Sequence, residues 1–349
     1  MSLRSRKLHW TMDELMQIEA GYTFKIQRQE KAVCQGVSLD REVCRDFQQY
    51  VRQIGFQNNR RCAWLYGKYV EKLAKSKVDE EAGPAVDSFG RPLKVRVRMP
   101  GAGGQMTTQV QVECSYEPPQ RCTADTIELL DDPHEELVSK VAKSLGLVRV
   151  GFMFSHPGPR EEGHHFSANE VILCAENQLL AGDDNMISPF VTVKVSLDEN
   201  NMADFQAYQM SKQCLELVAE GALIYDPAEP RGCLVHDTFS CLVASKEVSR
   251  VDNDYFLANV PIMDHVSELS NRFTHPTRFG GHEWNVAALG PYMKSVKNEP
   301  LLKRISDFQV LLLAAKVLDP QSMAAVCQSV SNKEELEEGY AMIMESLGR

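Results

Sequence analysis

The chain has 349 residues, of which 43% are hydrophobic and 25% are charged, as in a globular protein with two or three domains. Its 48 acidic and 38 basic residues give a net charge of −10, which disfavours general binding to nucleic acid or anionic membranes, because both need a cationic surface. The ten cysteines form no CxxC pair, and neither a secretory signal nor an 18-residue apolar run is present. We therefore expect reduced thiols, protein partners and no insertion into a membrane.

Residues 1–36 form a lead-in segment that includes a short predicted helix at 12–18. Apolar residues at three- or four-residue spacing predict a helix over 38–54, with Ser38 or Asp40 as its cap. A buried strand over 61–67 is expected to end at Gly67. An insertion follows at about 71–108, with loops at its ends and an alternating strand at 94–99.

The next elements alternate between strands and helices, which predicts a compact α+β unit. A strand ends before Pro118, and Asp132 with Pro133 marks the start of a helix that stops at Gly146. The predicted elements are a strand at 110–116, a helix at 132–145, a strand at 148–154, a helix from 167, a hairpin of 190–196 with 203–209, and a helix at 212–220.

A proline-rich stretch at 226–232 suggests a boundary, which divides the chain into a lead-in at 1–36, a first domain at 37–225 and a C-terminal domain at 226–349. The C-terminal domain has predicted strands at 238–244 and 255–262 and turns helical from about residue 284. One long apolar helix face runs from Leu301 to Ala315, and Ser331 with Glu334 predicts a capping box that opens the last helix.

The stretch Gly151-Phe-Met-Phe-Ser-His-Pro-Gly158, followed by Ser167-Ala-Asn-Glu170, resembles the zinc site of an MPN domain of the JAMM type. Such a site holds zinc with His-x-His at the end of a strand and with the aspartate of a Ser-x-x-Asp at the next helix start. Here the corresponding residues are Phe154, His156, Ser167 and Glu170. One ligand position is therefore a phenyl ring, and another carries a longer acid.

A catalytic zinc needs three protein ligands and a general base that manages the proton of the attacking water. Phe154 has no lone pair, so at most His156 and Glu170 remain as ligands. Counting back from Gly67 places Arg60 where these peptidases carry a glutamate base. Arginine stays protonated and its charge opposes a nearby zinc ion. We expect no catalytic residue, no bound cofactor and no metal.

Three other interpretations stay open. Ser167 and Glu170 also match a capping box, and His156 also matches a hydrogen-bonded turn histidine. Alternatively, the loop residues His164 or His165 complete a metal site, which would make the protein an active JAMM-like isopeptidase with stoichiometric zinc. A further alternative is an inactive MPN scaffold subunit of a larger complex, such as a proteasome lid or translation-initiation assembly.

Segments along nearly the whole chain resemble the nuclear protein localization protein 4 family, especially its plant-type members. The matching segments are Thr11-Met-Asp-Glu-Leu15, Arg28-Gln-Glu-Lys31, Val37-Ser-Leu-Asp40, Leu65-Tyr-Gly67, Tyr116-Glu-Pro-Pro-Gln120, Gly146-Leu-x-x-Val-Gly151, Phe205-x-x-Tyr-Gln-Met-Ser211, Val251-Asp-Asn-Asp-Tyr-Phe256 and Lys303-Arg-Ile-Ser-Asp-Phe308. The resemblance implies a catalytically inactive MPN domain, a mixed sheet flanked by helices, at 37–225. A smaller, β-containing and mainly helical domain would follow it.

The resemblance also implies a role as a non-catalytic, ubiquitin-binding adaptor. With ubiquitin fusion degradation protein 1, such proteins assist the AAA unfoldase called valosin-containing protein in extracting polyubiquitylated proteins for proteasomal degradation. This role implies a cytoplasmic and nuclear location, with access to the endoplasmic reticulum surface through partners for ER-associated degradation.

Three features depart from the family pattern. The ubiquitin-like domain through which relatives dock on the ATPase is not found, nor are their zinc knuckles or C-terminal ubiquitin-binding finger, and the insertion at 71–108 is longer than their hairpin. The sequence does not indicate which residues contact ubiquitin.

Overall fold

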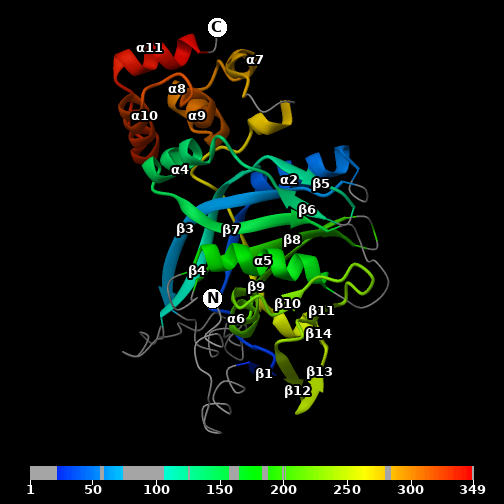
Figure 1. Cartoon of the computed structure of the whole chain (residues 1–349). Helices are drawn as coiled ribbons and strands as arrows, with labels where there is room; N and C mark the ends of the chain where they lie inside the picture. Colours follow the sequence, from blue (N-terminus) through cyan, green and yellow to red (C-terminus); the bar gives the residue numbers. More distant parts are fainter. Residues whose placement is uncertain are drawn as a thin grey trace, which may run out of the picture.

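The computed structural model describes residues 22–55, 59–73, 106–124, 126–156, 165–182, 188–198, 200, 202–279 and 284–347. Within these residues the strands form one eight-stranded mixed sheet and three small sheets (Figure 1). The large sheet has, in spatial order, β15 (Leu257–Val260), β9 (Ala203–Met210), β8 (Val191–Leu197), β7 (Val148–Ser155), β3 (Cys62–Leu73), β4 (Met106–Tyr116), β2 (Val37–Asp40) and β16 (Ile262–His265). This arrangement confirms the predicted α+β class.

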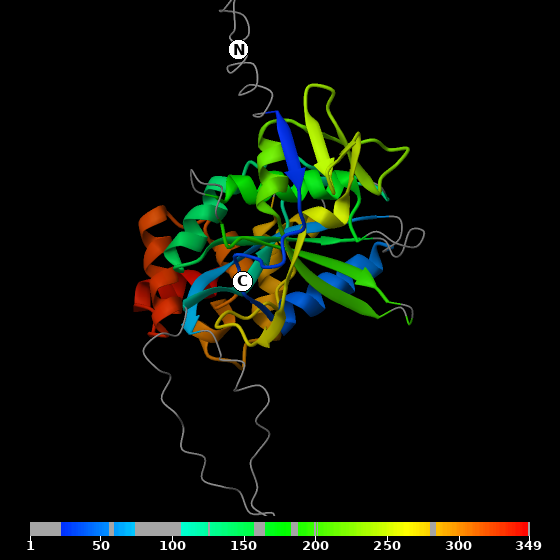
Figure 2. The same ribbon diagram turned by 90° about the horizontal axis from the view of Figure 1, so that it is seen from below.

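Helices cover both faces of the large sheet because its central strands alternate two sets of apolar side chains. Ala63 and Leu65 of β3 pack toward α2 (Arg41–Gln53), whereas Trp64 and Tyr66 pack in the core beneath α4 (Glu135–Ser144) and α5 (Ala168–Leu180). Figure 2 shows α2 and α5 on opposite sides of the sheet. Both faces of the central strands are therefore buried, which holds their ends in fixed positions.

The helices that flank the sheet begin near the residues that the sequence indicated. Asp40 caps α2 by accepting hydrogen bonds from the amides of Glu42 and Val43, and Ser211 caps α6 (Lys212–Ala219). The hairpin of β8 and β9 is confirmed. Helix α4 begins at Glu135, two residues after Pro133, the predicted first helical residue. Asp132 accepts hydrogen bonds from the Tyr116 hydroxyl and the His134 amide instead of capping the first turn.

The prediction that Gly67 ends its strand is wrong. Strand β3 continues to Leu73 and pairs with β4 back to Met106, so the ends of the predicted insertion are strand and not loop. The register with β4 shifts at Tyr66 and Gly67, which marks a β-bulge. A side chain at Gly67 would lie 1.9 Å from the carbonyl oxygen of Gln111. The glycine therefore permits a close backbone approach within a continuous strand.

We expect Gly67→Ala to destabilise the protein by about 1–3 kcal/mol, because the new methyl group would force two paired backbones apart. Gly339→Ala is a matched control: the site is in α11 (Glu338–Ser346), and apart from the chain neighbours and the backbone of this helix no described atom lies within 4 Å of the new methyl group. There alanine should be neutral or slightly stabilising. Urea unfolding of both variants measures the difference, and an equal stability of the two would contradict the prediction.

Residues beyond 225 complete the large sheet on both edges. Strand β15 pairs with β9, and β16 pairs in parallel with β2. The segment between β9 and β15 also supplies the small sheet of β10 (Leu223–Ile224), β11 (Gly232–Val235) and β14 (Arg250–Asp252). Its strand β12 (Ser240–Val243) pairs with β1 (Thr23–Ile26) on one side and with β13 (Lys246–Val248) on the other. The division at 225 and 226 stays a prediction, but the sheet itself extends across it.

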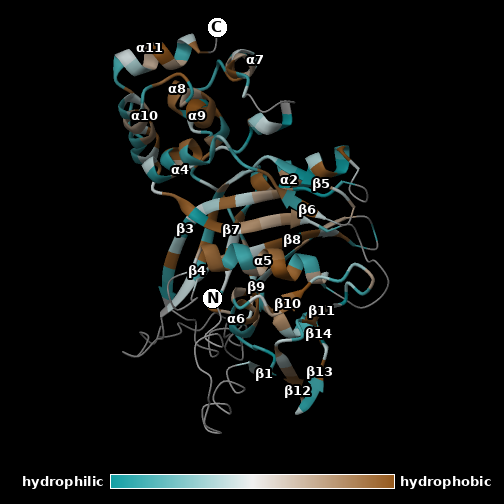
Figure 3. Ribbon diagram, in the orientation of Figure 1, coloured by the Kyte–Doolittle hydropathy of each residue, from teal (hydrophilic) through white to brown (hydrophobic). Residues whose placement is uncertain are grey.

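The C-terminal region is helical and lies beyond one end of the sheet, next to α4 (Figure 1). Its helices are α7 (Leu289–Ser295), α8 (Leu301–Ile305), α9 (Phe308–Ala314), α10 (Pro320–Asn332) and α11. Figure 3 shows α9 as strongly hydrophobic, and every residue of α9 is buried. This region packs into the same core as α4 and α5.

Two predictions for the C-terminal region are wrong. The apolar face from 301 to 315 belongs to two helices, because the Asp307 carboxylate caps α9 and also accepts hydrogen bonds from the amides of Arg272 and Phe273. Ser331 lies inside α10, which ends at Asn332 and has Lys333 as its C-cap in the left-handed conformation (φ 59°), so Ser331 and Glu334 form no capping box. Asp319, which was expected to stop the helix, is instead the N-cap of α10, and Pro320 is the first residue of that helix.

The predicted helix at 12–18 and the predicted strand at 94–99 lie outside the described residues. Among the helices of the described ranges, none is long and apolar enough to cross a bilayer.

Candidate functional site

Three chain segments meet where the JAMM-like pattern was found. Arg60 lies two residues before the start of β3, His156 directly follows β7, and Glu170 lies in the first turn of α5. Strands β3 and β7 are antiparallel neighbours, with Cys62 opposite Phe154, so the start of one strand lies beside the end of the other. The fold therefore brings together Arg60, Phe154, His156, Ser167 and Glu170.

The Glu170 carboxylate is the centre of this cluster. Its Oε1 accepts hydrogen bonds from Arg60 Nη1 at 2.6 Å and from His156 Nδ1 at 2.8 Å. Its Oε2 accepts from the Ser167 amide at 2.7 Å. Because each carboxylate oxygen has two lone pairs, both lone pairs of Oε1 are engaged by protein donors. A metal ion could use this oxygen only by displacing Arg60 or His156.

The charges of the cluster stabilise the ionised form of Glu170. Burial alone would raise the pKa of this carboxyl, but His156, Arg60 and the Ser167 amide lower the pKa to about 2, from an ordinary value of 4.5. The Arg60 guanidinium is itself buried and donates from Nε to the Ala124 carbonyl at 2.9 Å. Arg60 is thus held against Glu170 by contacts at both sides of its guanidinium.

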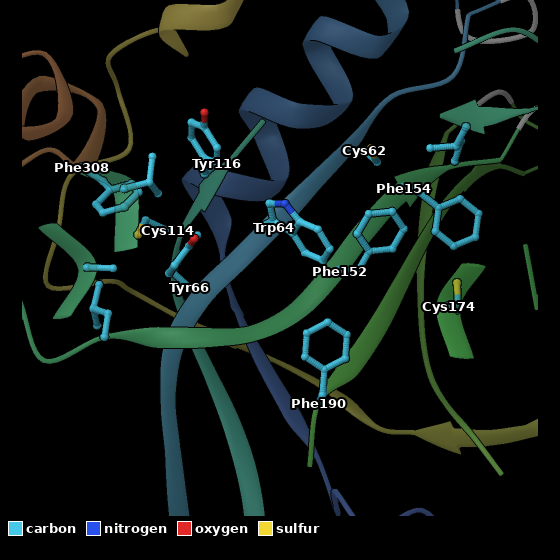
Figure 4. Packing of buried hydrophobic residues seen from close by; sticks show 14 of the residues in the cluster. Cys62, Trp64, Tyr66, Cys114, Tyr116, Phe152, Phe154, Cys174, Phe190 and Phe308 are labelled. Carbon is cyan, nitrogen blue, oxygen red and sulfur yellow. The ribbon is translucent and has the colours of Figure 1, made fainter. Parts of the chain in front are cut away.

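Phe154 lies wholly within the hydrophobic core, with no exposed surface. Its ring is 5.6 Å from that of Phe166 in an edge-to-face arrangement and 6.0 Å from the ring of Phe152. Figure 4 shows Phe154, Phe152 and Trp64 projecting from neighbouring strands into the same core. The position that corresponds to a histidine ligand in JAMM peptidases therefore contributes to packing.

The capping-box interpretation of Ser167 and Glu170 is confirmed, since the Ser167 hydroxyl accepts from the Glu170 amide and the Glu170 side chain accepts from the Ser167 amide. His156 is likewise a buried, hydrogen-bonded histidine that is 5% exposed. Glu170 thus both completes the cap of α5 and pairs with the charge of Arg60.

The loop histidines do not complete a metal site in the part of the chain that the structure describes. His164 lies outside the described residues, and His165 contributes its carbonyl oxygen, which accepts from Lys194 Nζ at 3.1 Å. Within the described ranges, no three His, Cys, Asp or Glu side chains gather in a way that could hold a metal ion.

Lys194 adds a second buried cation to this region. It lies on β8 opposite Phe154, is 5% exposed, and has its ammonium group 5.6 Å from the centre of the Phe166 ring. Burial lowers the pKa of Lys194, while Glu170, Asp204 and Asp254 oppose that shift. Arg60 and Lys194 together make the surroundings of Glu170 unfavourable for a divalent cation.

The comparisons with known proteins agree with the resemblance seen in the sequence. The sequence model of the NPL4 family matches residues 105–260. An NPL4-like protein of Oryza sativa subsp. japonica is 31% identical over 346 residues, which cover 97% of this chain and 73% of the rice protein. NPL4-like protein 1 of Arabidopsis thaliana is 32% identical over 333 residues, which cover 93% of this chain and 70% of the relative. The chain belongs to the NPL4 family.

The similarity extends to animal NPL4 relatives over a shorter stretch. The Nuclear protein localization protein 4 homolog of Homo sapiens is 34% identical over 135 residues, 33% of this chain and 22% of the human protein. The plant-type prediction therefore agrees with the longer matches to the rice and Arabidopsis proteins.

Sequence reasoning missed two members of the cluster in this NPL4-family chain. Lys194 interrupts the apolar run of β8. Because it is two residues after Thr192, both side chains lie on the same face of the strand, and this spacing could have indicated a buried cation there. The Ala124 carbonyl left no signal, because a backbone acceptor depends on the path of the hairpin formed by β5 (Gln120–Cys122) and β6 (Ile127–Leu129).

Proposed function

We propose that this NPL4-family protein is a non-catalytic adaptor that binds polyubiquitin for an AAA unfoldase of the valosin-containing protein type. Ubiquitin fusion degradation protein 1 is the expected second partner. The complex would act in the cytoplasm and nucleus, and at the endoplasmic reticulum surface through its partners. Its clients would be polyubiquitylated proteins that are extracted for proteasomal degradation.

The observation that carries the non-catalytic part of the proposal is the contact between Arg60 and Glu170. The guanidinium donates to the carboxylate at 2.6 Å, where a peptidase would place a metal ion and a general base. Arg60 cannot accept a proton, and Phe154 offers no ligand atom. An adaptor without hydrolysis also fits the role, since cleavage of ubiquitin on contact would release the client before the unfoldase engaged it.

We expect the purified protein to leave linked ubiquitin chains intact during incubation with added zinc, because the cluster offers neither a base nor a complete ligand set. Chain length is followed on gels beside an active JAMM peptidase as a positive control. The same protein should nevertheless retain the chains on a column. Zinc-dependent hydrolysis that is abolished by His156→Ala would instead support the isopeptidase interpretation.

The partner assignment is tested by affinity purification from cells that express the full chain. Recovery of the AAA ATPase together with ubiquitin chains supports the proposal. Recovery of proteasome-lid or translation-initiation subunits without either of these would favour a scaffold role. The Arg60→Met/Glu170→Gln variant, in which the buried charges are removed together, should recover the same partners if the cluster is structural.

A further inference from the structure

Two cysteine thiols share one acceptor beside the site already described. Cys62 is the first residue of β3. Cys122 is the last residue of β5, and Ala124 follows it in the connection between β5 and β6. The Sγ atoms of Cys62 and Cys122 each lie 3.4 Å from Oε1 of Gln120. Both sulfur atoms therefore approach the same oxygen atom, and the pKa of each thiol depends on the other thiol. The fold thus brings the sulfur atoms of two cysteines that are distant in the sequence to the same acceptor atom.

The backbone around the two thiols is well fixed. The Gln120 side chain accepts from the Cys62 amide at 2.8 Å and donates to the Cys62 carbonyl at 2.8 Å, so the start of β5 is tied to the start of β3. Cys62 has no exposed surface and is one of the core residues in Figure 4, whereas Cys122 is partly exposed. Cys122 is therefore partly accessible from solvent, whereas Cys62 is not.

The surroundings distinguish the two sulfur atoms chemically. A hydrogen bond from the Cys62 thiol lowers the pKa of Cys122, against the effect of partial burial, and the Arg61 and Arg60 guanidinium groups lower it further. Burial raises the pKa of Cys62. Because the thiolate is the reactive form, Cys122 is the nucleophile of the pair.

We propose that Cys122 and Cys62 form a peroxide-oxidisable pair, in which Cys122 reacts first and Cys62 closes a disulfide. The Cys122 thiolate would attack one oxygen of hydrogen peroxide, which forms the S–O bond of a sulfenic acid and breaks the O–O bond to release hydroxide. The Cys62 sulfur would then attack the Cys122 sulfur, which forms the S–S bond and breaks the S–O bond. The departing hydroxyl group takes the Cys62 proton and leaves as water.

The disulfide would fasten the hairpin of β5 and β6 to the start of β3. This hairpin carries the Ala124 carbonyl that accepts from Arg60, so the oxidised pair would brace the loop behind the Arg60–Glu170 contact. The inference depends on no part of the proposed adaptor role, because it concerns only thiols within this chain.

Cys44 is a matched control for the reactive cysteine. It is also partly exposed, but burial together with Asp40 and Asp264 raises its pKa to about 12. Trypsin separates the three residues of interest, since cleavage after Arg61, Arg121 and Arg41 gives peptides 62–68, 122–140 and 42–45. Mass spectrometry can therefore score each cysteine independently in the folded protein.

The test treats the full-length protein with hydrogen peroxide, blocks free thiols and digests without reduction. We expect peptides 62–68 and 122–140 to appear joined, lighter by two hydrogens than their sum. Cys122 should be consumed at least about tenfold faster than Cys44. In Cys62→Ser, a dimedone adduct should accumulate on Cys122. A Cys122 that stays free, or one that is oxidised no faster than Cys44 in the unmutated protein, would overturn the proposal.

Discussion

Replacing Arg60 with methionine should destabilise the protein by about 3–5 kcal/mol, because it leaves the buried Glu170 carboxylate without its guanidinium partner. Both side chains are almost completely buried, at 1% and 2% exposure. Methionine keeps much of the aliphatic volume of arginine, so the loss would come from the uncompensated charge. Urea unfolding monitored by tryptophan fluorescence at neutral pH measures the change.

A double variant separates the charge effect from a packing effect. In Arg60→Met/Glu170→Gln both charges are absent, while the glutamine oxygen can still accept from the Ser167 amide that Glu170 now satisfies. We expect much of the lost stability to return, since removal of both partners is far less costly than removal of one. A double variant as unstable as Arg60→Met would show that packing, and not charge, dominates.

An exposed arginine provides the control for this comparison. Arg41 pairs with Asp264 at 2.8 Å, but their side chains are 71% and 67% exposed. Water screens such a pair, so Arg41→Met should change the free energy of unfolding by less than about 1 kcal/mol. A similar loss in Arg41→Met and Arg60→Met would contradict the role assigned to burial.

The elements around the cluster could be predicted because local patterns determine them. The Ser167 capping box and the apolar periodicity of α2 need only neighbouring residues, and they appear as expected. Phe154 was found because it takes the place of the first histidine in a His-x-His pattern that ends at His156, and Arg60 was found by counting back from Gly67. Their assignment as altered peptidase positions is an interpretation that the observed contacts support.

Features that depend on distant backbone could not be predicted in the same way. Glycine commonly interrupts a strand, but Gly67 is required by a close approach of β4. Likewise, Asp307 divides an apolar helical pattern because it binds amides of a loop some 35 residues earlier in the chain. Strands β15 and β16 join opposite edges of one sheet through long-range pairing. No local pattern encodes these partners.

Acid should weaken the protein through the same buried carboxylate. The pKa of Glu170 is lowered to about 2 in the folded protein, from an ordinary value of 4.5. Between these two pH values the unfolded state binds a proton at Glu170 and the folded state does not. The stabilisation is therefore fully present above about pH 4.5 and is lost as the pH falls toward 2, where the folded state is protonated too. For Glu170 alone this amounts to about 3 kcal/mol.

Glu113 should add to the loss over the same range. Its side chain is 2% exposed and accepts hydrogen bonds from the Ser267 hydroxyl and the Glu268 amide. Despite burial, contacts with His265, Ser267 and Glu268 lower its pKa to about 2. Two buried carboxylates thus resist protonation in the folded protein, which predicts a steep decline of stability between about pH 5 and pH 2.

The decline can be assigned to Glu170 by comparing urea midpoints at pH 7, 5, 4 and 3. In Arg60→Met/Glu170→Gln the carboxylate is absent, so its midpoint should fall less steeply below pH 5 than that of the unmutated protein. Glu136→Gln is the control: the pKa of Glu136 is also lowered, by Lys140, but this pair is exposed to solvent, so the variant should follow the unmutated protein. Parallel declines in all three proteins would mean that Glu170 is protonated as readily in the folded state as in the unfolded one, and its contacts with Arg60 and His156 would then contribute no acid sensitivity.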